Sequence, residues 1–429
     1  MAAKNKLLVV QVAALGLDVA QNHGTSVADL KFSSLIPVFP AVTCAVQAAL
    51  RTGLDCSGNG MPGNGYFDRT LCKPLFWEQS AGIVEGPRIW RRFREAGGTV
   101  GMLFWQQSLG EEVDLVLSPA PIHKHHGGMI QDCYSQPEGL YRELCRRIGR
   151  RFNLMHYWGP MASVKSSAWS AAATVEVMGM DNAPQLLFTY LSGLDYDLLR
   201  HGPASPHAGR AWQAVGEQLA RLLEAAARHG YETIVFGDYA IRSVQTPVYP
   251  NRILREHGFM HCRAVNRMLY PDLYRSPAFA LVDHEIAHLY LKNPAVGSEV
   301  GELMRNTEGV AAVLDGRGKA EAGVDHPRAG DLVLVASPGC WFAYPWWGQG
   351  EKEPDYASHV DIHNKPGFDP CELFFGWPPL SVGRNPARVG GSHGAVDPHH
   401  PAAWSSTWLE PTSLHQLELA KEIEAFIDL

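Results

Sequence analysis

The sequence lacks the signatures of several protein classes. None of its eight cysteines forms a Cys-x-x-Cys pair, which argues against a zinc ribbon or a dithiol redox site. Basic residues are not in excess, with 37 Lys and Arg against 44 Asp and Glu, which argues against a protein that coats nucleic acid. No apolar stretch reaches the ~18 to 20 residues of a membrane span. Internal repeats and low-complexity tracts are also absent.

What the sequence does have is apolar material for a large core. Of its 429 residues 46% are hydrophobic and 19% are charged, so disorder is not expected. This length suits two or three domains, or one large domain with an insertion, and we favour the second arrangement. The 19 histidines stand out because histidine is a common metal ligand and acid–base group.

The N-terminal segment has two interpretations. Lys4 and Lys6 precede the apolar run 7–15, a pattern that imitates a short signal peptide. The run is short and is interrupted by Gln11, so we favour a buried first strand over residues 7–14. With that interpretation we expect a cytoplasmic protein.

The middle of the chain predicts a parallel sheet. An apolar run at 185–190 and another at 232–236 have strand character, and residues 210–229 carry an apolar stripe of helical period that ends at Gly230. Strand, amphipathic helix and strand in succession are typical of a βαβ unit. The expected fold class is therefore α/β, a mostly parallel sheet sandwiched by helices.

The pattern changes between 255 and 337. Short strands are predicted at 279–282, 287–291, 310–314 and 332–336, with a helix at 293–306. We therefore expect a small α+β cap insertion at 255–337, within a core made of 1–254 and 338–429. The segment from 338 onward is rich in Pro, Gly and Trp and is expected to be mostly loop.

Three aspartates follow predicted strand ends. Asp18, Asp195 and Asp238 come from strands far apart in the sequence, and the carboxyl ends of parallel strands are where ligands bind. Each one alone could be a helix N-cap or turn residue. Converging carboxylates repel one another unless a cation lies among them, so together they favour a metal site.

Thr43 is a candidate nucleophile. A Pro-containing extended segment leads into Thr43, and a helix is predicted from there to about Gly53. Free N–H groups at a helix start favour negative charge. Thr43 could be an ordinary N-cap, or a hydroxyl whose alkoxide is stabilised by the helix end and a metal.

These pieces resemble the type I phosphodiesterase/nucleotide pyrophosphatase family of the alkaline phosphatase superfamily. The resemblance spans nearly the whole chain and is closest to a bacterial subgroup with an Asp-His-x-x-Ala-His stretch. The matching segments, in the family's order, are Asp18, Phe39-Pro-Ala-Val-Thr43, Met61-Pro-Gly-Asn64-Gly, Tyr190–Asp195 with His201-Gly-Pro203, Val235–Tyr239, Asp283–His288, Asp361–Asp369 and Gly391-Ser-His393-Gly394.

The resemblance implies an alkaline-phosphatase-like fold and a metal-dependent hydrolase of phosphodiester or phosphate-ester bonds. Thr43 would form a phospho-threonine intermediate, and Asn64 would hold a phosphate oxygen. The implied cofactor is a divalent metal, zinc in one or two ions, and the implied substrate is a small phosphoester such as a nucleotide. The metal ligands implied are Asp18 and Asp238 for one ion and Asp195 and His393 for the other.

The sequence departs from the family at two metal ligands. Tyr239 and Leu199 stand where the family has histidine. As a substitute for the missing histidine ligands we prefer His363, which is close to Asp361, and His284 is the second choice. His201 would require a shifted loop. Two alternatives therefore stay open: a one-metal or altered-chemistry hydrolase of phosphoesters or phosphonates, and a non-catalytic binding protein on a degenerate phosphatase fold.

Substrate specificity is expected from the insertion and the aromatic segment 341–347. Its aromatic side chains could stack a nucleoside or cover an apolar leaving group. Alternatively, Trp346 and Trp347 could simply pack the insertion onto the core.

Overall fold

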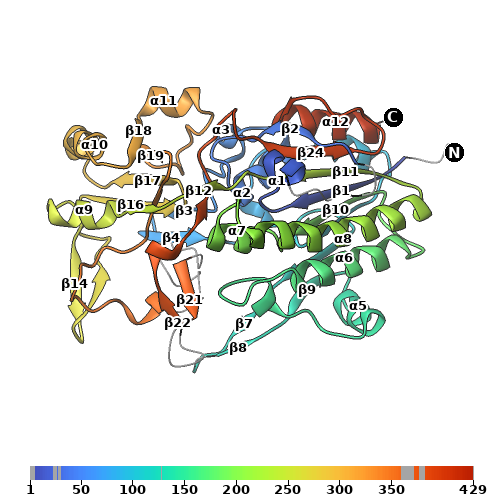
Figure 1. Ribbon diagram of the computed structural model, residues 1–429, viewed down its shortest axis with the longest axis horizontal. Helices are drawn as coiled ribbons and strands as arrows, with labels where there is room; N and C mark the ends of the chain where they lie inside the picture. Colours follow the sequence, from blue (N-terminus) through green and yellow to red (C-terminus); the bar gives the residue numbers. More distant parts are fainter. Residues whose placement is uncertain are drawn as a thin grey trace.

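The predicted mostly parallel sheet is confirmed. A computed structural model describes residues 5–22, 27, 30–126, 128–358, 372–375 and 382–428. Nine strands form the central sheet (Figure 1), and five of its eight strand pairs are parallel. In spatial order they are β25 (Leu414–His415), β2 (Ser33–Ile36), β24 (Ala402–Ser406), β11 (Tyr231–Gly237), β1 (Lys6–Val12), β10 (Leu186–Leu191), β5 (Val100–Leu103), β6 (Leu115–Pro119) and β9 (Cys133–Gln136).

The N-terminal apolar run forms the strand in the middle of this sheet. In β1 the side chains alternate between two cores: Leu8 and Val10 belong to one, and Leu7 and Val9 to the other. All four are fully buried. Apart from Gln11 the run is apolar, because both faces of β1 are covered by helices.

Helices cover the sheet on both sides. The core that contains Leu8 and Val10 also contains side chains of α6 (Lys165–Met178) and α8 (Pro206–His229). The opposite core contains side chains of α2 (Thr43–Thr52) and α12 (Gln416–Asp428), and α12 lies above the sheet in Figure 1. This three-layer arrangement leaves the carboxyl ends of the strands as the edge where polar side chains gather.

The helix of the predicted βαβ unit is longer than its apolar stripe. Helix α8 begins at Pro206, because the Ser205 side chain caps it by accepting a hydrogen bond from the Ala208 N–H. It ends at His229, where Gly230 adopts a φ of 73°. The crossover passes β1, which separates β10 from β11 in the sheet.

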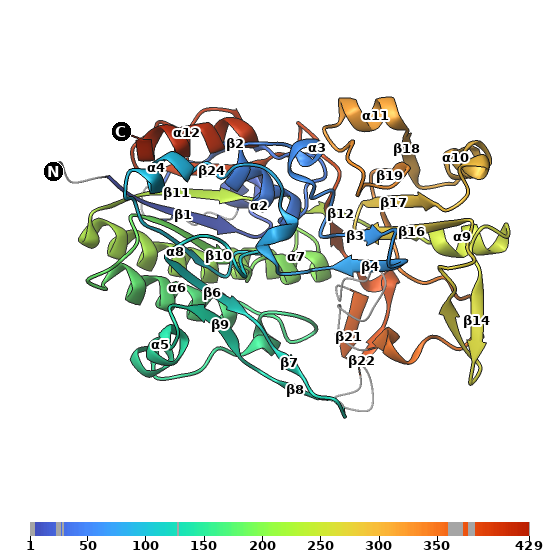
Figure 2. The same ribbon diagram turned by 180° about the vertical axis from the view of Figure 1, so that it is seen from behind.

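The insertion contains an antiparallel sheet of four strands, as an α+β unit predicts. The order is β16 (Ala278–Asp283), β17 (Ile286–Leu291), β19 (Leu332–Ala336) and β18 (Val310–Leu314). Helix α10 (Gly297–Arg305) is shorter than predicted because Pro294–Val296 forms a 3-10 turn. Figure 2, from behind, shows this lobe beside the central sheet, with β3 (Gly65–Asp68) and β4 (Lys73–Phe76) next to it.

Most of the aromatic segment after the insertion packs inside this lobe, whereas Trp341 belongs to a core of the central sheet. Trp346 and Trp347 are buried in the same apolar core as β16 and β17. The packing interpretation therefore holds for both tryptophans. The C-terminal segment is more regular than predicted, since it supplies β24, β25 and α12.

The remaining elements are short. The helices are α1 (Leu17–Asn22), α3 (Cys56–Asn59), α4 (Arg91–Glu95), α5 (Leu140–Ile148), α7 (Asp195–His201), α9 (Pro250–Glu256) and α11 (Gly316–Glu321). The strands are β7 (Ile122–His123), β8 (Met129–Ile130), β12 (Arg242–Ser243), β13 (Thr246–Val248), β14 (Cys262–Val265), β15 (Met268–Pro271), β20 (Cys340–Phe342), β21 (Leu373–Phe375), β22 (Val382–Arg384) and β23 (Gly391–Ser392). Within the described ranges, no helix has both the length and the apolar character needed to cross a bilayer.

Candidate active site

Thr43 is the first residue of α2, as predicted, and its side chain is buried beside a carboxylate. The Thr43 hydroxyl donates a hydrogen bond to Asp238 Oδ2 over 3.1 Å. The preceding residue, Val42, offers the helix no side-chain cap. The start of α2 is therefore an electropositive end that faces the Thr43 hydroxyl and its surroundings.

Asp238 follows β11 directly and is fully buried. Besides Thr43, three groups donate hydrogen bonds to the Asp238 carboxylate: Gln11 Nε2 at 2.8 Å, the Ala14 N–H at 2.9 Å and the Tyr239 N–H at 3.1 Å. Burial raises the pKa of Asp238 to about 7, although these hydrogen bonds oppose that rise. A carboxyl with such a pKa can take up and release a proton near neutral pH.

Asn64 is held between the helix start and the insertion. Its Oδ1 accepts a hydrogen bond from the Cys44 N–H over 3.0 Å, within the first turn of α2. Its Nδ2 donates to Asp283 Oδ1 over 3.0 Å, and its backbone N–H donates to Asp283 Oδ2 over 2.9 Å. Since an amide NH₂ has two hydrogens, one of them is left for a ligand in the cavity.

Tyr239 occupies the centre of the site. Its hydroxyl donates to Asp195 Oδ1 over 3.1 Å and lies 3.5 Å from Thr43 Oγ1. Its ring stacks on that of His393 with centroids 3.5 Å apart and the planes 1° from parallel. Burial, together with Asp195 and Asp238, raises the pKa of the Tyr239 hydroxyl well above its ordinary value, so it stays protonated.

His393 is buried behind Tyr239. Its Nδ1 lies 2.9 Å from the Ala41 carbonyl oxygen, and its ring centroid is 4.0 Å from that of His284. Burial, and secondly His284, lowers the pKa of His393 well below its ordinary value. His393 is therefore a neutral imidazole in the folded protein.

Four of the predicted site residues line one narrow cavity of about 30 Å³: Thr43, Asn64, Asp195 and His393. Asp238 lies directly beside it through its hydrogen bond to Thr43. A larger hollow of about 380 Å³ adjoins the cavity, since Gln106, Tyr157 and Trp158 line both. The remaining lining residues of the narrow cavity are Trp77, Gln106, Tyr157, Trp158, Tyr190, Ser192, Tyr196, Tyr239 and His284.

Asp18 does not reach this cavity. Strand β1 ends at Val12, which pairs in register with Gly237, so Ala13 takes the position that corresponds to Asp238. Asp18 lies later, in α1, where its carboxylate is 3.6 Å from His400 Nε2 and lines a different hollow. His363 lies outside the described residues.

The described residues do not fit the two-metal centre that the resemblance implies. Leu199 is buried in the apolar core. Both oxygens of Asp238 already accept protein hydrogen bonds. Around Thr43, the described residues bring together no three His, Cys, Asp or Glu donor atoms within 4.8 Å of one another.

Sequence reasoning missed several residues of the site. Tyr239 was noted only because it replaces a metal-binding histidine of the family. In the structure the Tyr239 hydroxyl lies between Thr43 and Asp195. Sequence reasoning also did not place Asp283 behind Asn64 or Trp158 beside the cavity. For Tyr239 the sequence offered a signal, because it places a tyrosine directly after Asp238, where a metal ligand was expected.

Comparisons with known proteins agree with the resemblance. The family model for type I phosphodiesterase/nucleotide pyrophosphatase matches residues 28–369, and members of that family are generally dependent on divalent metals. Comparison with the curated proteins gave no match.

Similar solved structures include two hydrolases of related fold. Phosphonoacetate hydrolase from Sinorhizobium meliloti 1021, in complex with phosphonoacetate, has a TM-score of 0.65 and 15% identity, and the match covers 99% of this chain and 96% of that one. Murine ectonucleotide pyrophosphatase/phosphodiesterase 5, as an inactive threonine-to-alanine variant in complex with AMP, has a TM-score of 0.63 and 16% identity over 99% and 96% of the two chains. The chain belongs to the type I phosphodiesterase/nucleotide pyrophosphatase family, a family of phosphoester hydrolases.

Proposed function

We propose that this protein hydrolyses a phosphoester with Thr43 as the nucleophile. The observation that carries the proposal is the hydrogen bond from the Thr43 hydroxyl to the buried Asp238 carboxylate, at the start of α2. A hydroxyl is a weak nucleophile until a base takes its proton. Asp238 is correctly placed for that task, and its raised pKa suits it.

The reaction would proceed in two displacements. In the first, a bond forms between Thr43 Oγ1 and phosphorus, the Thr43 proton passes to Asp238 Oδ2, and the leaving-group oxygen departs from phosphorus. In the second, the oxygen of a water molecule forms a bond to phosphorus and releases one proton to solvent, the bond from phosphorus to Thr43 Oγ1 breaks, and Asp238 returns its proton to Thr43 Oγ1. The Asn64 amide and the free N–H groups at the start of α2 would hold the phosphate oxygens.

The described residues support the altered-chemistry alternative over a two-metal centre. Among the described residues that line the cavity there is no Lys or Arg, so neutral hydrogen-bond donors would bind the phosphate there. A single zinc ion held by Asp195 and His393, with His363 as a further ligand, remains a prediction. Dialysis against a chelator, followed by measurement of activity and metal content with and without added Zn²⁺, distinguishes a metal-free enzyme from a one-zinc enzyme.

The adjoining hollow indicates where the leaving group would lie. Tyr157 and Trp158 line both the narrow cavity and the larger hollow. We therefore propose an aryl or nucleoside phosphodiester as the substrate class, since flat rings stack on such side chains. Phosphonates are the second class to assay, because a similar structure holds phosphonoacetate. A cytoplasmic location also remains a prediction.

Turnover of bis(4-nitrophenyl) phosphate by Thr43→Ala tests the proposal. This variant should lose measurable turnover while its thermal unfolding stays close to that of the wild type. Thr43→Ser, which keeps a hydroxyl, should retain part of the activity. Thr174→Ala is a matched control, since Thr174 is another buried threonine whose hydroxyl hydrogen-bonds outside the cavity. Unchanged activity in Thr43→Ala would overturn the proposal, and a wild type that binds but never turns over phosphoesters would favour the binding-protein alternative.

A further inference from the structure

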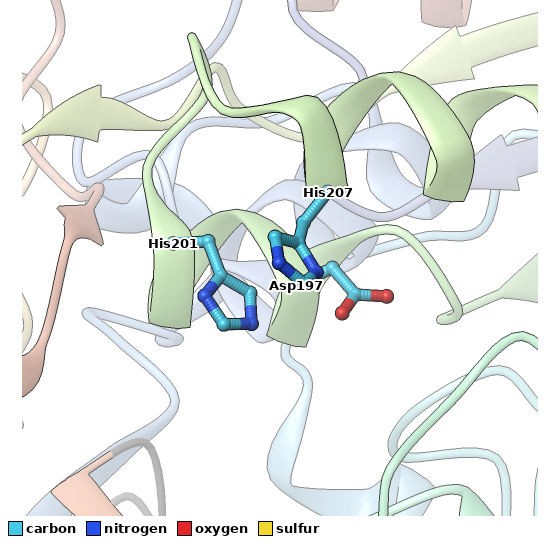
Figure 3. A group of neighbouring side chains, drawn as sticks. All are labelled: Asp197, His201 and His207. Atoms are coloured by element: carbon cyan, nitrogen blue, oxygen red, sulfur yellow. The ribbon is translucent and has the colours of Figure 1, made fainter.

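Three side chains of metal-binding types gather outside the cavity, at the junction of α7 and α8. These side chains are Asp197, His201 and His207, and one donor atom from each lies within 4.8 Å of the other two. Figure 3 shows the three together, with the His201 and His207 rings face to face. The ring centroids are 3.9 Å apart and the planes are 18° from parallel. In the part of the chain that the structure describes, this is the one such group of three found.

The local sequence explains the juxtaposition. Asp197 and His201 are four residues apart in α7, a spacing that puts both side chains on one face of the helix. Asp195 stands two residues before Asp197, on a different face of α7, and lines the Thr43 cavity, which Asp197 does not. The cap formed by Ser205 starts α8 at Pro206 and thereby places His207 in its first turn. The cluster is thus separate from the active site although it shares a helix with it.

The three side chains make no hydrogen bond or ion pair with described residues outside the cluster, although Arg200 and Arg210 lie near enough to Asp197 to interact with it electrostatically. Among the described residues, no hydrogen bond or ion pair joins the side chain of Asp197, His201 or His207 to another residue. Asp197 is half-buried and the two histidines are exposed, so an ion from solvent can reach all three. The nearby arginines make no ion pair with the half-buried Asp197 carboxylate, and a cation bound directly to it would offset the cost of its burial.

We propose that Asp197, His201 and His207 bind a divalent transition-metal ion of the zinc class. Two imidazole nitrogens and one carboxylate oxygen are ligands that zinc accepts, and three protein ligands leave a fourth position for water. The ion would connect the last turn of α7 to the first turn of α8. This site is independent of the function proposed for Thr43.

Zinc binding to the full chain tests the proposal. After removal of bound metal with a chelator, calorimetric titration with Zn²⁺ should show a site that the double variant His201→Ala/His207→Ala lacks, so that the number of zinc ions bound per chain falls by about one. The control is His125→Ala/His126→Ala, which removes two exposed histidines from another surface cluster and should leave that number unchanged. Equal zinc binding by the wild type and His201→Ala/His207→Ala would overturn the proposal.

Two further measurements separate this site from the cavity. His393→Ala, which alters only the cavity, should leave the junction site intact, and Asp197→Asn should weaken it. With Co²⁺ as the probe, the visible absorption that the junction site contributes should decrease in Asp197→Asn and persist in His393→Ala. The opposite pattern would place the ion in the cavity and refute the junction site. Because the two histidines are exposed, their loss should leave circular dichroism unchanged.

Discussion

Replacing Tyr239 by Phe tests whether its hydroxyl serves catalysis. The substitution keeps the ring that stacks on His393 at 3.5 Å and removes only the oxygen between Asp195 and Thr43. The lost hydrogen bond to Asp195 should cost about 1 to 2 kcal/mol of stability. If the hydroxyl turns its one hydrogen from Asp195 toward charge that develops at Thr43 during the reaction, then kcat should fall by about 10²- to 10³-fold in this variant.

The assay is kcat and KM for an aryl phosphodiester, together with urea unfolding of the same samples. Tyr231→Phe is the matched control, because the Tyr231 hydroxyl also donates a buried hydrogen bond, to the Pro184 carbonyl, but lies away from the cavity. We expect it to lose similar stability and no activity. A Tyr239→Phe enzyme with wild-type kcat would refute the role of the hydroxyl, and equal losses of activity in the two variants would assign the effect to stability.

Other predictions concern the surroundings of the site. Because burial raises the pKa of Asp238 from 3.8 to about 7, the folded protein binds more protons than the unfolded chain between these values, so the contribution of Asp238 to stability falls as pH rises from about 4 to about 7. In Asp238→Asn this slope should disappear from urea unfolding at a series of pH values, and an unchanged slope would contradict the burial argument. Gly237→Ala should destabilise by about 2 to 3 kcal/mol in thermal unfolding, since its Cβ would lie 2.1 Å from the Leu15 carbonyl oxygen. Trp346→Ala should cost about 3 to 5 kcal/mol and leave KM unchanged, as expected for a core residue. Trp158→Ala should instead raise KM about tenfold if the leaving group stacks there, and an unchanged KM would place that group elsewhere.

Much of the fold follows from periodicity in the sequence. The run that became β1 could be assigned because a strand buried on both faces is continuously apolar. The amphipathic stripe of α8 and its terminal glycine were equally informative. The C-terminal helix α12 was missed because Pro, Gly and Trp dominate the segment before it.

The candidate site could be predicted only in part. Thr43, Asn64, Asp195 and His393 could be named because each belongs to a local motif, and the structure brings them to one cavity. Asp18 could not be judged, because its place depends on where β1 ends and on the register between strands that are remote in sequence. The sequence also could not distinguish a stacking surface from a core for the aromatic segment, because burial is a tertiary property.

The pairing of Asn64 with Asp283 joins the active site to the insertion. Asn64 donates two hydrogen bonds, one from its side-chain amide and one from its backbone N–H, to Asp283, the last residue of β16 before its turn into β17. Any fluctuation that lifts this turn away would expose the Asn64 amide to hydrogen exchange and release the residue that caps the start of α2. These two hydrogen bonds therefore couple the insertion to the helix that begins at Thr43, the proposed nucleophile, and a chain trimmed of the insertion would lose a wall of its candidate site along with a lobe.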